Sequence, residues 1–368
     1  MPIASALAAI HQRHRATLAD YTGWELPADF GDPAAEYAAA VSACALFDCS
    51  HRGKLELTGA DAPTLLHNLC TNDIKSLPLG GGCEMFLTTA TAKVVGHGYV
   101  YHVLIGSDHA LHLDTDPGQA PRLLTHLDRY IISEQVELAD RTEALAQLHL
   151  AGPTAAAVLA AVLQQSVPPL QPLQHMQRTF GASADAAIRA RDPLGVPGFD
   201  VVCQRGVAET IWQALVQAGA RPAGLKVYEL LRVEAGTPVY GVDMDENRFV
   251  VEVNRPWAIC YTKGCYLGQE PIVMARDRAG HAPRQFVGLR FAGGSVPAAG
   301  AKLLAAEKEI GQVTSTAVSP RFGPVGLGYV RWAYREPGTA LTTDAGQAVT
   351  VAALPMGSHG GGVTETLK

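Results

Sequence analysis

The chain has 368 residues, of which 48% are hydrophobic and 17% charged, so it is long enough for two or three domains with a large core. Its 29 basic and 35 acidic residues give a formal charge of −6 without a prominent basic run, which disfavours nucleic-acid wrapping through phosphate neutralisation. No apolar stretch approaches the roughly 20 residues of a membrane span, so no membrane partner is expected.

Cysteine usage and the first residues indicate a cellular compartment. Seven cysteines is an odd number spread over the chain, which is not typical of a disulfide framework. Cys260 and Cys265 are five positions apart and lack the spacing of a zinc site. The segment Met1 to Arg15 lacks the charged start and long apolar run of a secretory signal. We therefore expect a reduced, cytoplasmic protein without a metal site.

The first hundred residues alternate between helical and strand patterns. Helices are expected over residues 1–19, 33–45 and 61–70, and strands over 53–57, 84–89 and 93–103. Asp48, Ser50 and His51 are the residue types of a catalytic triad. Triad members are rarely chain neighbours, so capping and turn hydrogen bonds are the expected role of Asp48 and Ser50.

Four histidines, at positions 97, 102, 109 and 112, fall in or just after the last of these strands. At a period of two they would lie on different faces of a sheet, so no metal site is expected among them. From residue 121 to 218, helices and strands continue to alternate in a way that favours an α+β fold. Neither a Gly-x-Gly-x-x-Gly motif nor a Gly-Lys-Ser/Thr phosphate loop is present.

The last third changes character. A helix over 225–234 ends at Gly236, and from Phe286 onward short strands broken by Gly and Pro predict a small β-barrel. The expected domains are residues 1–283, made of two α+β subdomains, and a barrel over 284–356. A flexible tail is expected over 357–368.

The octapeptide Lys263-Gly264-Cys265-Tyr266-Leu267-Gly268-Gln269-Glu270 is the most chemically mixed stretch. An ammonium group near a thiol enriches the thiolate, the form that reacts or binds soft metals. Cys265 and Lys263 are therefore the candidate catalytic pair. The alternative is a structural cysteine in a tight turn.

Three separated stretches resemble the glycine-cleavage T-protein family of folate-dependent aminomethyltransferases. They are residues 46–53, 59–62 and 231–241, and the resemblance spans roughly residues 20 to 355. The octapeptide resembles a narrower signature, that of YgfZ proteins, which bind tetrahydrofolate and support iron–sulfur cluster assembly or repair. The resemblance implies a cloverleaf of α+β domains around a folate cavity with a C-terminal β-barrel.

The resemblance also implies a set of cofactor-binding residues. Asp200 stands where T-proteins have a pterin-binding Glu, while Arg232 and Tyr240 match positions that line the folate. Gln269 and Glu270 complete the predicted tetrahydrofolate-binding set and can hold the loop or a partner.

One departure from the T-protein pattern bears on activity. Where T-proteins carry a Gly-Gly-x-x-Asp-Asp run, this chain has Gly96 and His97, and a positioned acid or base typically contributes ~10²–10⁴-fold to rate. His97 is a possible substitute because imidazole titrates near neutrality. The main hypothesis is therefore a YgfZ-type protein whose partners are iron–sulfur client proteins or assembly factors. The alternatives are a folate-dependent aminomethyl or methyl transferase or demethylase, and a scaffold that has lost folate.

Overall fold

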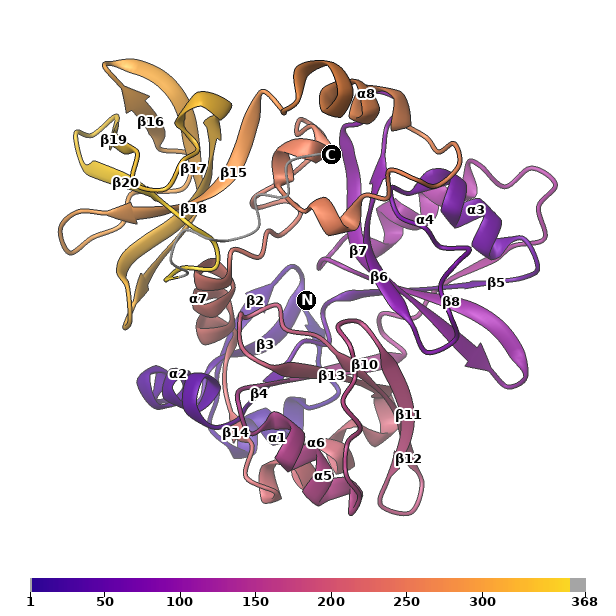
Figure 1. The fold of residues 1–368 in the computed structure, drawn as a ribbon. Helices are drawn as coiled ribbons and strands as arrows, with labels where there is room; N and C mark the ends of the chain where they lie inside the picture. The colour runs from indigo at the N-terminus through magenta and orange to yellow at the C-terminus, as the bar shows by residue number, and fades with distance from the viewer. Residues whose placement is uncertain (1, 358–368) are drawn as a thin grey trace. The chain divides into compact units, whose positions relative to one another are not determined.

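A computed structural model (Figure 1) describes residues 2–357 of the chain, which divide into two compact units. Of the described residues, unit 1 comprises 2–67, 72–85 and 98–228, and unit 2 comprises 68–71, 86–97 and 229–357. The predicted tail falls almost wholly on residues 358–368, which lie outside the described part. Within 2–357, none of the helices has the length and apolarity needed to cross a bilayer.

Unit 1 contains a six-stranded mixed sheet in the order β11-β12-β13-β10-β4-β14. Its strands are β4 (Ala45–Asp48), β10 (Leu145–Ala151), β11 (His175–Phe180), β12 (Ala184–Ala190), β13 (Gly198–Gln204) and β14 (Arg221–Pro222). Alternation along β10 explains its two faces, because Leu148 and Leu150 enter the hydrophobic core while Gln147 and His149 point to the opposite face. The core face packs with residues of α1 (Ala8–Arg13), α5 (Ala155–Leu163) and α6 (Ala208–Gln217), including the buried Trp212.

A second sheet has the order β6-β7-β8-β5-β9, and a third, small sheet has the order β1-β3-β2. The bounds are β1 (Ile3–Ala4), β2 (Thr17–Tyr21), β3 (Trp24–Asp29), β5 (Gly53–Thr58), β6 (Gly82–Thr88), β7 (Val94–Ile105), β8 (Asp108–Thr115) and β9 (Glu137–Asp140). Three helices complete this part: α2 (Pro33–Ser42), α3 (Ala62–Leu69) and α4 (Ala120–Asp128).

Unit 2 ends in a closed six-stranded barrel, the orange-to-yellow part of Figure 1. Its strands are β15 (Arg284–Phe291), β16 (Lys302–Ala305), β17 (Lys308–Ser319), β18 (Gly323–Arg331), β19 (Ala340–Thr343) and β20 (Ala348–Ala352). Gly311 allows close strand approach, since a Cβ there would lie 2.1 Å from the Tyr329 carbonyl oxygen. The predicted α+β class with a C-terminal β-barrel is confirmed.

The predicted helix over residues 1–19 is wrong, and two strands were not predicted. The long N-terminal helix is limited to α1, because Arg15 adopts φ 54° and the next residues pair as β2 with β3. Strands β8 and β19 were not expected. Each is paired on both sides, β8 with β5 and β7, and β19 with β16 and β20, so its formation depends on neighbouring strands more than on its own sequence.

Candidate functional site

A buried network of charged side chains occupies unit 1. Asp114, in β8, accepts hydrogen bonds on one oxygen from Arg52 Nε at 2.9 Å. On the other it accepts from Gln147 Nε2 at 2.9 Å and Arg191 Nη1 at 3.3 Å. The Arg52 and Asp114 side chains are 7% and 0% exposed. Charges buried to this degree need partners, and Asp114 receives them from strand β10 and from two loop positions, Arg52 and Arg191.

Asp200 belongs to the same network and is the predicted pterin-binding carboxylate. Its Oδ1 accepts from His149 Nδ1 at 2.8 Å and its Oδ2 from Arg191 Nη1 at 3.0 Å. His149 and Asp200 are opposite each other in the β10–β13 register, so their side chains share one face. Burial alone would raise the pKa of Asp200, but the Arg191 charge and the His149 hydrogen bond lower that pKa below its ordinary value.

Several buried polar atoms around Asp200 have no hydrogen-bond partner among the described residues. They are Arg52 Nη2, Arg191 Nε, Gln147 Oε1, His149 Nε2 and Tyr101 Oη. Buried polar atoms are normally satisfied, so unsatisfied ones close to a charged carboxylate are places where water or a polar ligand binds. A pterin edge offers amide-like donors and an acceptor, and this donor–acceptor set fits such a group.

Arg232 and Tyr240 both lie in unit 2. Arg232, in α7 (Leu225–Ala235), donates from Nη1 to Asp243 Oδ2 at 2.7 Å, and from Nη2 to Ser315 Oγ at 3.0 Å. Its Nε donates to Glu229 Oε2 at 2.7 Å. Burial opposes the charge, yet Asp243 and Glu229 raise the pKa of Arg232 above its ordinary value. Tyr240 is 8% exposed and bridges to Met244 in the turn that carries Asp243. Arg232 therefore fixes this turn.

The octapeptide forms a loop in unit 2 that leads into α8 (Gln269–Met274). The Lys263 ammonium is held by the Cys70 carbonyl oxygen at 2.8 Å and lies 4.7 Å from the centre of the Tyr266 ring. Cys265 is an exposed free cysteine. Gly268 adopts φ 82°, and a Cβ there would come within 2.5 Å of both Thr88 Oγ1 and the Thr89 carbonyl oxygen. The loop is thus anchored at Gly268 and Lys263, and it presents Cys265 outward.

The remaining predicted residues also lie in unit 2. Gln269 is half-buried and its backbone N–H donates to the Tyr266 carbonyl at 3.2 Å, whereas Glu270 is exposed in the first turn of α8. His97 is 1% exposed, and its ring packs 5.0 Å from that of Phe86. Because it is enclosed, the His97 imidazole is not accessible to exchange protons directly with solvent.

The four histidines were predicted to lie on different faces of a sheet, and this prediction is wrong for His102 and His109. His102 Nε2 and His109 Nδ1 are 2.8 Å apart and His102 Nδ1 is 2.8 Å from the Leu77 carbonyl oxygen. These two rings meet because β7 and β8 are antiparallel neighbours with Val103 opposite Ala110. Among the residues described, no cluster of three or more metal-ligating side chains occurs.

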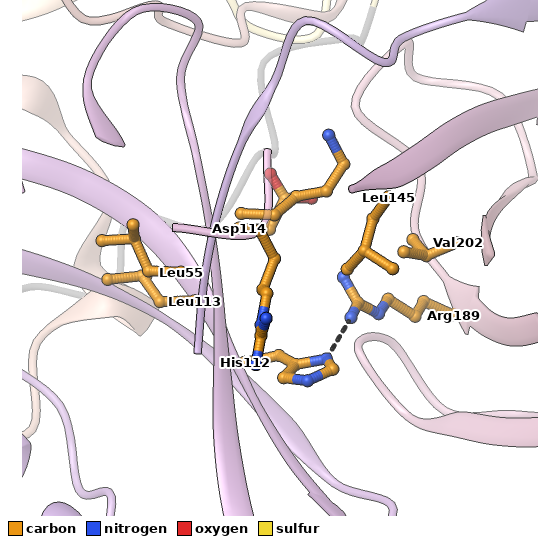
Figure 2. Close-up of a pocket in the computed structure, with 9 residues that line it drawn as sticks. Leu55, His112, Leu113, Asp114, Leu145, Arg189 and Val202 are labelled. Carbon is orange, nitrogen blue, oxygen red and sulfur yellow. Dashed lines mark hydrogen bonds between the residues drawn. The ribbon is translucent and has the colours of Figure 1, made fainter. Parts of the chain in front are cut away.

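Figure 2 shows a pocket in unit 1 that borders the Asp114 network. It is lined by Lys54, Leu55, His112, Leu113, Asp114, Arg141, Leu145, Arg189 and Val202. Arg189 Nη2 is 3.2 Å from His112 Nδ1, the contact dashed in the figure. Arg189 also stacks 4.2 Å from the centre of the Tyr101 ring.

Sequence reasoning missed the partners that hold Asp200. Arg191 lies nine positions before Asp200 and His149 lies 51 before it, so their convergence depends on strand register. One local signal was available: Arg189 and Arg191 stand two apart at the end of an alanine-rich strand, where apolar residues are expected.

Comparison with known proteins identifies the class to which this architecture belongs. The GCVT N-terminal domain matches residues 7–263, and the glycine cleavage T-protein C-terminal barrel domain matches residues 284–356. The chain therefore belongs to the glycine cleavage T-protein family of folate-dependent aminomethyltransferases. All of the octapeptide except Lys263 falls between the two matched regions.

Individual relatives cover nearly the whole chain. A probable aminomethyltransferase of Natronomonas pharaonis is 31% identical, covering 90% of this chain and 91% of its own length. An aminomethyltransferase of Streptomyces avermitilis is 30% identical, with 92% of each chain covered. The crystal structure of the glycine cleavage aminomethyltransferase T of Bartonella henselae superposes with a TM-score of 0.87. It covers 96% of this chain and 98% of that one at 23% identity, which shows the shared fold.

Proposed function

We propose that this protein binds tetrahydrofolate and transfers a one-carbon unit, as an aminomethyl or methyl transferase or as a demethylase. The observation that carries the proposal is the match to both family domains, together with relatives named aminomethyltransferase that are aligned over nine-tenths of the chain. Tetrahydrofolate supplies the nitrogens that carry the one-carbon unit.

Asp200 is the proposed anchor for the pterin. Arg191 and His149 keep its carboxylate ionised in a buried setting, so it can accept hydrogen bonds from amide-like donors. Arg232 contributes in this proposal by positioning the turn of Tyr240, because Asp243, Ser315 and Glu229 engage its guanidinium.

Calorimetric titration with tetrahydrofolate tests the binding step. Asp200→Asn removes the charge at nearly constant volume, and losing a hydrogen bond to a charged group costs about 1.5–3 kcal/mol, or about 10–100-fold in Kd. Asp192→Asn, at an exposed site nearby in sequence, is the matched control and should leave the Kd unchanged. Equal affinity in wild type and Asp200→Asn would show that Asp200 does not bind the pterin. A wild-type protein that does not bind tetrahydrofolate would refute the proposal.

The transfer step needs its own measurement. Incubation with tetrahydrofolate and a panel of amines and methylated amines should yield methylene- or methyl-tetrahydrofolate, detected by mass spectrometry. If folate binds but no product forms, the transfer activity is refuted, and the second candidate function, described next, is favoured.

That second candidate is a YgfZ-type role in iron–sulfur cluster assembly or repair, with client proteins or assembly factors as partners. Two observations favour it: the exposed thiol of Cys265, and the presence of Gly96 and the enclosed His97 where the family pattern has acidic residues. Cys265 would be the reacting group, with Lys263, Gln269 and Glu270 shaping its loop. In a strain lacking the protein, full restoration of iron–sulfur enzyme activities by Cys265→Ala would refute this role.

A further inference from the structure

Two histidines near the end of the β7–β8 hairpin share one face of their sheet in unit 1. His102 is half-buried in β7, and His109 is exposed in β8. They are diagonal neighbours, because His109 is opposite Leu104 and the side chain of Leu104 lies on the same face as that of His102. A metal was not expected here because the side chains were predicted to point to different faces, and that reason fails for this pair.

The backbone fixes the tautomer of His102. Its Nδ1 lies 2.8 Å from the carbonyl oxygen of Leu77, which can only accept a hydrogen bond, so Nδ1 carries the proton. The neutral ring then has its lone pair on Nε2, which lies 2.8 Å from Nδ1 of His109. Metal-binding histidines have the same arrangement, in which one ring nitrogen donates to a carbonyl or carboxylate and the other coordinates the ion. His102 is therefore already oriented as an Nε2 ligand.

The second ring can become a ligand through a small rearrangement. In the structure His109 Nδ1 donates to His102 Nε2, and the ring centres are 5.0 Å apart. Because His109 is exposed, its ring is free to turn, and exchange with water moves its proton from Nδ1 to Nε2. This change of tautomer frees the Nδ1 lone pair without a net gain or loss of protons.

Neighbouring groups do not occupy this face. His175 Nε2 donates to the backbone carbonyl oxygen of His102 at 3.0 Å, and the His175 ring packs 5.7 Å from the centre of the Tyr101 ring. The guanidinium of Arg189 also stacks on Tyr101, at 4.2 Å. Tyr101 and His102 are consecutive in a strand, so their side chains lie on opposite faces of the sheet. The Arg189 charge is therefore on the far side of β7 from the histidine pair.

We propose that His102 Nε2 and His109 Nδ1 form a binding site for one divalent transition-metal ion. Imidazole nitrogen suits nickel, copper and zinc, whereas magnesium and calcium prefer oxygen ligands. No third metal-ligating side chain joins the pair among the residues that the structure describes, so water would fill the remaining coordination positions. The ion would connect β7 to β8, and the site is independent of the folate chemistry proposed above.

Calorimetric titration of the full chain with nickel chloride tests the site. His109→Ala removes one ligand at an exposed position, and it should weaken the Kd for nickel by more than the ~10–100-fold that loss of an outer-shell partner costs. His14→Ala, at another exposed histidine, is the matched control and should leave the Kd unchanged. Magnesium chloride should give no binding that depends on His109. A nickel affinity that His109→Ala does not change would overturn the proposal, even if nickel binds elsewhere, for example at Cys265.

Anomalous diffraction locates the ion without any variant. Crystals of the wild-type protein soaked in nickel chloride should give an anomalous peak about 2 Å from both His102 Nε2 and His109 Nδ1. A peak bound to His109 alone, or no peak beside the two rings, would show that the pair is only hydrogen-bonded and would overturn the metal site.

Discussion

The two regions that carry the candidate residues hold their charges in opposite ways. In unit 1 the charges of Asp200 and Arg191 are enclosed and paired, and in unit 2 the same holds for Arg232 and Asp243. At the octapeptide, Cys265 and Glu270 face solvent. The loop is held by the Lys263 ammonium, which donates to the backbone carbonyl oxygen of Cys70. Enclosed charges are expensive to rearrange, so they fix geometry before a ligand arrives. An exposed thiol can instead meet a large partner.

Breaking an enclosed pair should have the largest effect. Arg232→Met leaves the carboxylate of Asp243, which is 0% exposed, without its cation, and removal of one member of a buried pair costs about 3–5 kcal/mol. Urea unfolding followed by circular dichroism should show this loss. Arg331→Met, at an exposed position, is the control and should change the unfolding free energy by less than about 0.5 kcal/mol. A loss of unfolding free energy in Arg232→Met as small as that of the control would show that this enclosed pair does not stabilise the fold.

The enclosed region should also respond to pH. His112 and His175 have folded pKa values of about 4, below the ordinary value of 6.5, so between these limits the unfolded chain binds more protons. The contribution of these two histidines to the unfolding free energy should therefore be fully present above pH 6.5. It should fall as the pH drops toward 4. By pH 5 the loss is at most about 2 kcal/mol for each histidine.

Urea unfolding at pH 7 and pH 5 measures that loss. His112→Gln should reduce the dependence on pH, and His14→Gln, at an exposed position, should not. An unchanged pH dependence in His112→Gln would place the proton uptake elsewhere.

The contrast between the regions also explains what the sequence could predict. The barrel was predictable because Gly and Pro punctuate short β-rich segments between residues 284 and 356. Asp200 was found through family resemblance, but Arg191 and His149 were not, because side-chain convergence follows from register across three strands. The octapeptide was conspicuous by composition alone, yet only the structure showed that the Lys263 ammonium is directed to the Cys70 carbonyl oxygen.

The two glycines of the octapeptide, Gly264 and Gly268, should differ in their tolerance of alanine because only Gly268 packs closely against other residues. Gly268→Ala places a Cβ at φ 82° and within 2.5 Å of Thr88 Oγ1 and the Thr89 carbonyl, so a cost of about 1–2 kcal/mol from conformation alone is expected. Gly264→Ala is the matched control, because its Cβ would meet nothing within 4 Å. If both variants unfold at the wild-type urea midpoint, the loop is not anchored at Gly268.

The smallest effect on stability is expected at Cys265, and it is the most informative about function. Cys265 is exposed, whereas Cys83 and Cys260 are partly buried and the other four cysteines are buried, so Ellman's reagent should titrate one thiol quickly in the native protein. Cys265→Ser should remove that fast phase while changing the unfolding free energy by less than about 0.5 kcal/mol, and Cys83→Ser should keep it. A fast phase that survives Cys265→Ser would show that the loop does not present this thiol, and the contrast between enclosed carboxylates and an exposed thiol would then not hold.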